Sequence, residues 1–310
     1  MDEFDLIKAY FLPLAGPNGL GLRDDVASLN LPKGIVSVDS FVEGVHFPVG
    51  WAADKIGPRV LRCAVSDIVA KGVPPKHYLV GLSVTKDFSR DFFEKFAQGL
   101  QDSQRELDVD LIGGDSTKTD GPTVVSITVL GDAPDGFVPR SGAHPGDDVW
   151  VTGTIGDAYL GLIHSEEDPA DIWTSAYERP SLPLEFSQHL RAVASASADV
   201  SDGLLADLAH IGIASQVGFD LYIDRIPLSE PSEEWIKNSR DRLRLASSGD
   251  DYQIVFTAPK TVRDKIAGLR ADTQTRVTRI GLCTDRSGVR CLEDGSRELK
   301  FKDGGYTHFA

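Results

Sequence analysis

Short apolar runs alternate along this chain with longer stretches of helical periodicity. Residues 54–71 place Ile56, Val60 and Ile68 on one stripe, the pattern of an amphipathic helix. Residues 123–130 alternate between apolar and polar side chains, which predicts a half-buried strand. The same patterns predict helices at 3–12, at 89–107, from about 157 and after 203, and strands at 35–38, 78–85, 109–112, 149–152, 219–223 and 252–257.

A segment rich in Pro, Gly and Asp, residues 132–148, separates two halves of the chain. Each half mixes helices and strands without a strict βαβ alternation, which predicts the α+β fold class. We therefore expect two α/β-mixed domains, residues 1–137 and residues 138–310. The chain has 310 residues, enough for two domains of ordinary size.

Aspartates recur where these apolar runs begin or end, in short clusters flanked by Gly or Ser. The clusters are Asp24-Asp25, Asp39, Asp67, Asp115, Asp199 with Asp202, and Asp250-Asp251. Carboxylates that line a cleft are costly unless cations neutralise them. Their hard oxygen ligands favour Mg²⁺ or Ca²⁺, and protein-bound Mg²⁺ usually bridges to substrate phosphates. Phosphoryl transfer is therefore the first functional hypothesis.

The composition of the chain limits the classes of partner that it can bind and the compartment in which it is expected. The formal net charge of −15 argues against nucleic acid and against an anionic membrane, both of which need a basic face. Three cysteines without paired spacing fit a reducing compartment. No signal-peptide pattern and no apolar run of about 18 residues is present, so a cytoplasmic protein is expected.

Turn aspartates also have plain structural uses. Asp24-Asp25 and Asp39 can cap nearby backbone N–H groups without any metal. Asp115 after Gly113-Gly114 fits a tight turn as well as it fits close approach to a phosphate. Asp67 differs, because it borders the apolar stripe of its helix, and a half-buried carboxylate needs a partner such as a cation.

Other polar residues keep two interpretations. In Asp199–Gly203, Ser201 is a good N-cap and Asp202 suits the helix dipole, yet a helix start also binds anions and their metals. Arg140, in a Pro/Gly loop, is either a phosphate clamp or a solvated surface arginine. His46 either bonds a ligand phosphate or satisfies its own loop.

No standard phosphate-binding motif settles the matter. Gly153 to Gly156, between a strand and a helix, hints at a phosphate cradle but matches neither a Walker A loop nor a dinucleotide fingerprint. The protein-kinase signature set is missing as well.

In their order along the chain and in their residue sequences, however, the clusters resemble one family, the thiamine-monophosphate kinases, within the superfamily of aminoimidazole ribonucleotide synthetase. The resemblance runs over essentially the whole chain. Its segments are Arg23–Ala27, Ser37–Asp39, Glu43–Phe47, Val65–Gly72, Leu111–Ser116, Arg140–Ala143, Pro145–Asp147, Val151–Gly156, Asp199–Leu204, Ser248–Tyr252 and Gly305–Phe309.

The resemblance implies transfer of the ATP γ-phosphate to thiamine monophosphate, with several Mg²⁺ ions, in a homodimer whose N-terminal sheets pair. It makes residues 1–137 the ATP/Mg-binding and dimerisation domain, and residues 138–310 the domain that completes the active site. The implied Mg²⁺ ligands are Asp25, Ser37, Asp39, Asp67, Asp115, Asp199 and Asp202. The implied nucleotide contacts are Gly114, Asp115, Arg140 and Ser201, and the implied thiamine-phosphate contacts are His46, Asp250 and Tyr306.

This implied reaction suits an acidic chain. The acceptor phosphate is already ionised, so we assign no general base and expect direct in-line transfer without a covalent intermediate. Some positions depart from the family: Arg23 replaces a glycine, Val38 and Ser116 replace threonines, Lys71 replaces a methionine, Asp250 replaces a glutamate, and Ser248 and Gln253 replace a glycine and a glutamate. None of these removes an implied Mg²⁺ carboxylate.

Two alternatives stay open at this point. One is another ATP-dependent kinase or synthetase of the superfamily that acts on a different phosphate or carboxylate acceptor. The other is a non-catalytic nucleotide-binding protein, against which the full set of carboxylates argues.

Overall fold

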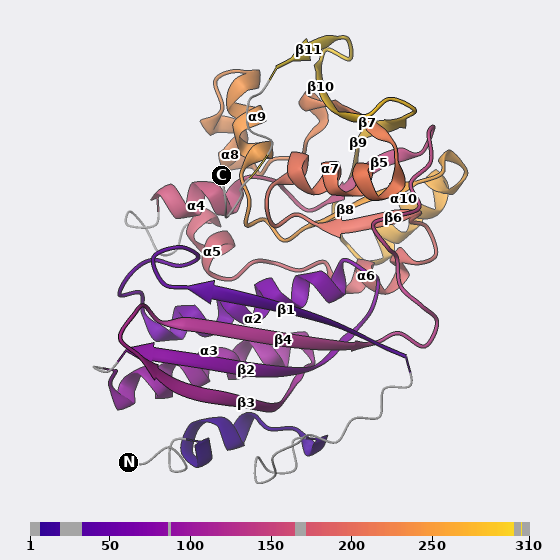
Figure 1. The fold of residues 1–310 in the computed structure, drawn as a ribbon. Helices are drawn as coiled ribbons and strands as arrows, with labels where there is room; N and C mark the ends of the chain where they lie inside the picture. Colours follow the sequence, from indigo (N-terminus) through magenta and orange to yellow (C-terminus); the bar gives the residue numbers. More distant parts are fainter. Residues whose placement is uncertain (1–6, 19–32, 86–87, 165–171, 301–304, 306–310) are drawn as a thin grey trace. The chain divides into compact units, whose positions relative to one another are not determined.

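The computed structural model describes residues 7–18, 33–85, 88–164, 172–300 and residue 305. The chain forms two compact units, Met1–Ile68 with Val73–Gly136, and Val69–Gly72 with Phe137–Ala310 (Figure 1). Each unit mixes helices with one sheet, so the α+β fold class is confirmed. Across the described residues, no helix is both long and apolar enough to cross a membrane.

The N-terminal unit has a four-stranded sheet in the order β1-β4-β2-β3. Its elements are η1 (Ile7–Phe11), η2 (Leu12–Leu14), β1 (Gly34–Val42), α2 (Ala53–Val69), β2 (Pro75–Thr85), α3 (Arg90–Leu107), β3 (Asp110–Thr119) and β4 (Val124–Asp132). Helices α2 and α3 cover one face of the sheet (Figure 1). Ile127 and Val80 on that face, and Phe96 and Leu100 of α3, are at most 4% exposed, so the core lies between helices and sheet.

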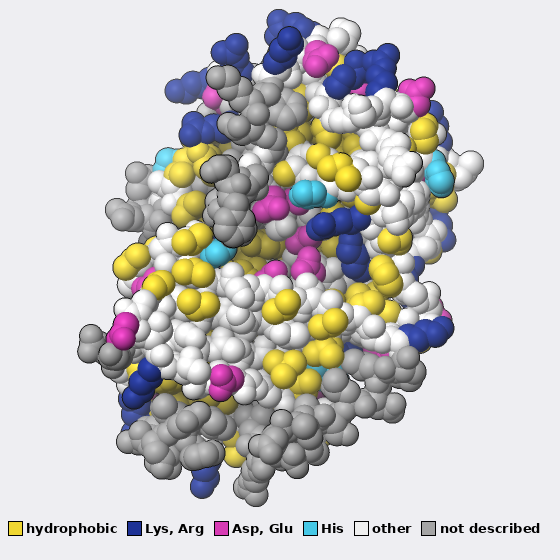
Figure 2. All heavy atoms as spheres, viewed as in Figure 1, with side chains coloured by type: hydrophobic (Ala, Val, Ile, Leu, Met, Phe, Trp, Pro, Cys, Tyr) yellow, Lys and Arg dark blue, Asp and Glu magenta, His cyan; other side chains and the backbone are white. Residues whose placement is uncertain are grey.

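The other face of this sheet is open in the single chain. Along β1, exposed and partly buried residues alternate, as the two-residue period of a strand requires. Val36 and Val38, on the open face, are 66% and 62% exposed. Hydrophobic side chains are scattered over this face, with few charged side chains among them (Figure 2).

The C-terminal unit has a seven-stranded sheet in the order β11-β10-β7-β9-β5-β8-β6. Its strands are β5 (Asp148–Thr152), β6 (Ala196–Asp199), β7 (Gly218–Tyr222), β8 (Ile254–Ala258), β9 (Val277–Thr284), β10 (Gly288–Glu293) and β11 (Arg297–Leu299). Its helices are α4 (Asp157–His164), α5 (Ile172–Glu178), α6 (Leu184–Leu190), α7 (Leu204–Ser215), η4 (Ile223–Arg225), α8 (Glu230–Trp235), α9 (Ser239–Ser247), η5 (Lys260–Val262) and α10 (Arg263–Asp272).

Helix α7 supplies the centre of this unit's core. Leu204, Leu208 and Ile211 are fully buried with Val149 and Val151 of β5. The opposite side of the same strands carries an aromatic group, in which Trp150 stacks on Phe256 and Phe186 tilts against it. Burial on both faces explains why β5 and β8 read as nearly continuous apolar runs.

The short segment Val69–Gly72 packs with the C-terminal unit. Ser187 Oγ donates to the Val69 carbonyl at 2.5 Å, and Ser197 Oγ donates to the Ala70 carbonyl at 2.5 Å. Lys71, which stands where the family usually has methionine, donates from Nζ to the Ser197 carbonyl at 2.6 Å. The departure at Lys71 therefore adds a hydrogen bond within this unit.

Two expected boundaries were wrong. Strand β3 does not end at Ile112 but continues to Thr119, so Gly113-Gly114-Asp115 lies within a strand and not in a turn. Gly114 lets the neighbouring strand approach closely, since a Cβ there would lie 2.1 Å from the Val80 carbonyl oxygen. Helix α7 begins at Leu204, with Gly203 as N-cap in place of Ser201.

Candidate functional site

In the N-terminal unit, β1 and α2 bring together two of the predicted metal ligands. Ser37 points to the helix-covered face of the sheet, and its Oγ donates a short hydrogen bond to the Asp67 carboxylate of α2. Asp39 follows two residues later on the same strand and therefore on the same face. Hydroxyl and carboxylate oxygens are the donors that Mg²⁺ prefers, so this group fits the implied metal.

Asp115 lies on the opposite face of the same sheet. The strand register aligns it in one row with Gly81, Ser126 and Ser40. The Ser40 and Ser126 hydroxyls bond each other at 2.6 Å on the open face, which fixes the direction of that row. Strands β1 and β3 are the two edges of the sheet, about 14 Å apart. Within one chain, Asp115 therefore does not join Ser37 and its neighbours, and Gly114 lies in the adjacent row.

His46 sits in a tight loop directly after β1. Its Nδ1 accepts a hydrogen bond from the Val42 backbone N–H at 2.9 Å. Because a backbone N–H can only donate, the ring proton must reside on Nε2, and the neutral ring offers Nε2–H as a donor. The ring also meets the edge of Phe41, with centroids 5.9 Å apart, which holds its orientation.

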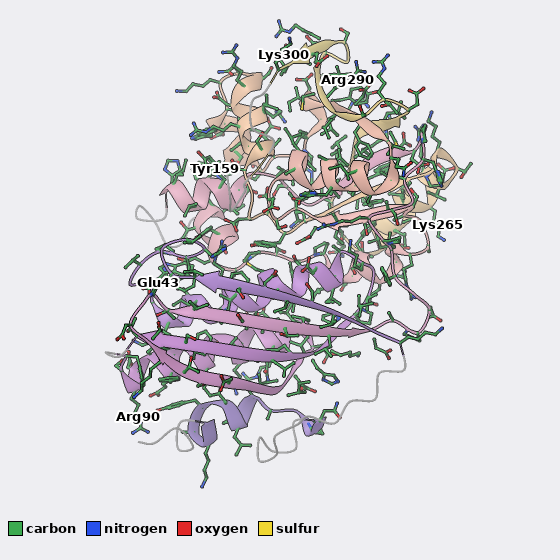
Figure 3. All side chains as sticks on the ribbon, viewed as in Figure 1. Glu43, Arg90, Tyr159, Lys265, Arg290 and Lys300 are labelled. Atoms are coloured by element: carbon green, nitrogen blue, oxygen red, sulfur yellow. The ribbon has the colours of Figure 1, made fainter. Side chains whose placement is uncertain are left out.

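Glu43 holds this His46 loop in place, a role that the sequence analysis did not predict. It follows the last residue of β1 (Figure 3). Its Oε1 accepts the Gly50 N–H at 2.8 Å, and its Oε2 accepts the Thr123 N–H at 3.0 Å. Partial burial raises the pKa of the Glu43 carboxyl, but these backbone hydrogen bonds outweigh it, so the pKa lies below its usual value.

In the C-terminal unit, a loop between β6 and α7 carries Asp199, Ser201 and Asp202. Asp199 ends β6 and is buried. The loop is organised by Asp207, in the first turn of α7, whose Oδ2 accepts the backbone N–H groups of Ser201, Asp202 and Gly203 at 3.0, 3.1 and 3.1 Å. The N-cap of α7 is Gly203, without a side-chain cap, so the capping suggested for Ser201 is not found, and Asp207 instead holds the loop that precedes the helix.

Asp207 is 1% exposed and lies among other acids. Burial raises its pKa to about 8, together with the negative charges of Asp199 and Asp202, although backbone hydrogen bonding and Arg140 partly oppose the shift. In the described part of the chain, ligand atoms of Asp202, Asp207 and His210 lie within 4.8 Å of one another. A cation bound by Asp202 would relieve the repulsion between it and buried Asp207, so Asp202 fits the implied Mg²⁺.

The Asp250 loop is hydrogen-bonded to the Ser201 loop. The Asp250 N–H donates to the Ser201 carbonyl at 2.9 Å, and the Tyr252 N–H donates to the Val200 carbonyl at 2.8 Å. Asp250 and Tyr252 both adopt left-handed backbone conformations, φ 74° and 50°, and the Tyr252 hydroxyl donates to Asp250 Oδ1 at 3.1 Å. Gly249 is required here, since a Cβ would lie 2.2 Å from the Ser201 oxygen.

Arg140 joins this group from another loop. The Ser215 hydroxyl, at the end of α7, donates to the Arg140 carbonyl at 3.0 Å and accepts the N–H groups of Gly142 and Ala143 at 3.1 Å each. The Arg140 side chain is exposed, and its charge acts on buried Asp207. The two ends of α7 therefore hold the two loops that carry Asp202 and Arg140.

The Gly153–Gly156 loop is packed internally. The Gly156 N–H donates to both oxygens of Asp251, at 2.8 and 2.9 Å. Burial raises the pKa of the Asp251 carboxyl well above its usual value, while the Gly156 bond opposes the shift. A Cβ on Gly153 would lie 2.3 Å from Gln253, so this turn supports its neighbours. In the loop suggested as a phosphate cradle, the Gly156 N–H is therefore already hydrogen-bonded to Asp251.

Two predicted site residues, Asp25 and Tyr306, lie outside the described residues. Gly305, just before Tyr306, is described, and a Cβ there would lie 2.4 Å from the Ala206 Cβ and 2.7 Å from the Asp202 carbonyl oxygen.

Comparison with known proteins bears on this geometry. Residues 23–133 match the family model of the AIR synthase related protein, N-terminal domain. The thiamine-monophosphate kinase of Caulobacter vibrioides is 36% identical over 99% of this chain and 90% of its own length.

Solved structures agree over similar lengths. The crystal structure of thiamine-monophosphate kinase from Stenotrophomonas maltophilia K279a matches with a TM-score of 0.84 and 34% identity, covering 96% of this chain and 98% of the other. A structure of AaThiL complexed with AMPPCP and TMP matches with a TM-score of 0.78 and 29% identity, over 99% and 97%. The chain belongs to the thiamine-monophosphate kinase family.

Proposed function

We propose that this chain transfers the γ-phosphoryl group of ATP directly to the phosphate of thiamine monophosphate, giving thiamine diphosphate and ADP. Relatives that match it over nearly their full length are named thiamine-monophosphate kinases, and the AaThiL structure holds AMPPCP and TMP. The observation that carries the proposal is the gathering of oxygen ligands, in each unit, at positions predicted from the sequence, above all the Ser37–Asp67 pair beside Asp39.

The chemistry of the reaction explains why carboxylates dominate. Two unit charges about 4 Å apart repel by about 4 kcal/mol at an effective dielectric of 20, and here two polyanions must meet. Bound Mg²⁺ supplies the positive charge that offsets this repulsion and the charge of the transferring group. The chain's part is to hold ligands and substrates in line. The acceptor phosphate is already ionised, so the proposal needs no general base.

Residue roles follow from this proposal. Asp25, Ser37, Asp39, Asp67, Asp115, Asp199 and Asp202 bind Mg²⁺. Gly114, Asp115, Arg140 and Ser201 contact the nucleotide, and His46, Asp250 and Tyr306 contact thiamine monophosphate. For His46 the structure adds a chemical detail: hydrogen-bonded from Val42, the ring acts on the phosphate as a neutral Nε2–H donor.

The proposal includes a homodimer formed through the open face of the N-terminal sheet. Its support is the pair of exposed valines Val36 and Val38 and the position of Asp115. Since Asp115 lies on the face opposite Ser37 and Asp67, it can join a metal group that includes them only from a second chain. Inactive Asp67→Asn and Asp115→Asn chains, refolded together, should then regain activity in mixed dimers. Mixtures no more active than either variant would refute the shared site.

The alternative is another kinase or synthetase of the superfamily. A direct assay separates them: ADP release is followed with ATP and Mg²⁺, with and without thiamine monophosphate. ADP release that requires thiamine monophosphate supports the proposal. ATP turnover that ignores it and responds to another acceptor favours the alternative. The proposal also places the enzyme in the cytoplasm.

A further inference from the structure

The loop that precedes α7 is held by a side chain of that helix. Backbone N–H groups that are taken from water need an acceptor within the protein. Here three successive N–H groups, of Ser201, Asp202 and Gly203, converge on one oxygen of Asp207. The N-cap residue, Gly203, has no side chain with which to do this. These N–H groups are therefore engaged within the protein and do not face a phosphate.

Asp207 holds a loop whose position matters for two of the proposed roles. Asp202 is a proposed Mg²⁺ ligand, and Ser201 is a proposed nucleotide contact. The Ser201 carbonyl in turn accepts the Asp250 N–H at 2.9 Å. A chain of hydrogen bonds thus runs from the Asp207 carboxylate through the Ser201 loop to the proposed substrate residue Asp250.

The Ser201 loop also packs closely against the neighbouring Asp250 loop. A Cβ on Gly203 would lie 2.7 Å from the Ser247 carbonyl oxygen, and one on Gly249 would lie 2.2 Å from the Ser201 oxygen, so the two loops are packed backbone to backbone. Without Asp207, three N–H groups of the loop before α7 would lose their acceptor, and such losses are relieved by moving the backbone.

We propose that Asp207 is a positioning residue of the kinase: it fixes the Ser201 loop so that Asp202 meets the metal and Ser201 meets the nucleotide. The kinetic effects expected from this role rest on the proposed function. The role of Asp207 in holding the loop does not depend on it. Residues that orient metal ligands typically change metal affinity or activity by about 10- to 100-fold when they are removed.

The first test needs no activity. Hydrogen exchange of the peptide that covers residues 199–204 is compared, by mass spectrometry and without metal, in the wild type, Asp207→Ala and Asp207→Asn. Asparagine keeps a side-chain oxygen that accepts hydrogen bonds. Loss of protection in Asp207→Ala with retention in Asp207→Asn is expected. Equal protection in all three proteins would overturn the proposal, whatever the substrate of the enzyme proves to be.

The second test separates positioning from direct metal ligation. Mn²⁺ binding is measured by electron paramagnetic resonance, and the Mg²⁺ concentration for half-maximal activity is measured beside it. We expect Asp207→Ala to raise this concentration about 10- to 100-fold and Asp207→Asn to restore most of it. If Asp207→Asn is as defective as Asp207→Ala while its exchange stays protected, the carboxylate itself binds metal and the positioning role is wrong.

A matched control guards against a general loss of stability. Asp264 is an exposed acid in the first turn of α10, in the same unit. Asp264→Ala should leave both the exchange of residues 199–204 and the Mg²⁺ requirement unchanged. If Asp207→Ala does not fold, Asp207→Asn carries the test, because its exchange and Mn²⁺ binding must both stay close to wild type.

Discussion

Two loops in different units are held by the same device, a carboxylate that accepts successive backbone N–H groups. In the N-terminal unit, Glu43 accepts two and fixes the loop of His46. In the C-terminal unit, Asp207 accepts three and fixes the loop of Ser201 and Asp202. Both carboxylates lie next to residues that are proposed to bind a ligand, and neither carboxylate is itself proposed to bind one.

The two clamps nevertheless have opposite electrostatics. Hydrogen bonds win at Glu43, whose pKa lies below its usual value. At Asp207 burial wins, helped by Asp199 and Asp202, and the pKa rises to about 8 in spite of an additional N–H donor. At Asp207, therefore, three hydrogen bonds do not offset the effect of burial and of neighbouring charge on the pKa.

The largest expected effect comes from Asp67, which is proposed to bind metal and holds no loop. Asp67→Asn should lower turnover about 100-fold or more, because a catalytic metal contributes several kcal/mol to transition-state stabilisation. Steady-state kinetics at high Mg²⁺ and the unfolding curve measure this. Asp54→Asn, at an exposed position of the same helix, is the control. Wild-type turnover in a folded Asp67→Asn enzyme would remove Asp67 from the metal site.

The second effect is on stability and sets the two clamps against each other. A raised folded-state pKa means that folded Asp207 binds a proton that the unfolded chain has released, so stability falls as pH rises towards about 8. In metal-free protein this loss should reach up to about 2 kcal/mol between pH 6 and 8, and Asp207→Asn should abolish it.

Glu43 should behave in the opposite way. Its lowered pKa means that its contribution is present above its unfolded value and is lost as pH falls through the folded value. Thermal unfolding of wild type, Glu43→Gln and Asp207→Asn between pH 3 and 8, in EDTA, tests both signs. A wild-type protein that gains stability from pH 6 to 8 through Asp207 would contradict the comparison.

A smaller effect is expected from removal of the Glu43 clamp. Glu43→Ala leaves the Gly50 and Thr123 N–H groups without their acceptor and loosens the His46 loop, so the KM for thiamine monophosphate should rise about tenfold. The KM for ATP should stay nearly constant. Glu43→Gln, which keeps one accepting oxygen, should lie between. Equal changes in both KM values would show that Glu43 does not act through His46.

The smallest effect is expected at Asp250, a single proposed substrate contact. Asp250→Ala should raise the KM for thiamine monophosphate about fivefold, the worth of one hydrogen bond of about 1 kcal/mol, and should change the KM for ATP less. Asp250→Glu, which restores the usual family residue, should retain binding. An unchanged dependence on thiamine monophosphate in Asp250→Ala would exclude this contact.

Hydrophobic periodicity in the sequence predicted part of the candidate site. The helical wheel placed Asp67 beside an apolar stripe, because that position follows from a fixed repeat, and the apolar run at 35–38 predicted the strand that carries Ser37. Asp115 could not be placed in the same way. Its face depends on the extent of β3 and on a register shift at Tyr78/Leu79, and one residue of slip moves a side chain to the other face.

The clamps were missed for a different reason. Glu43 and Asp207 bind N–H groups of loops, and which N–H groups converge on them depends on backbone conformations that no repeat encodes. The one available signal for Asp207 was an acid in the first turn of a helix that starts after Asp-Gly, which suits a helix N-terminus but does not identify three partners. Carboxylates that hold loops through backbone N–H groups are recognised only from the three-dimensional structure.

We propose that this chain makes thiamine diphosphate by a metal-assisted transfer between two phosphates. Phosphorus NMR of the pure protein with ATP, Mg²⁺ and thiamine monophosphate tests this reaction. We expect the diphosphate signals of thiamine diphosphate and of ADP to appear in step, and EDTA to abolish both. ATP that stays intact, or ADP that forms with inorganic phosphate in place of thiamine diphosphate, would contradict it.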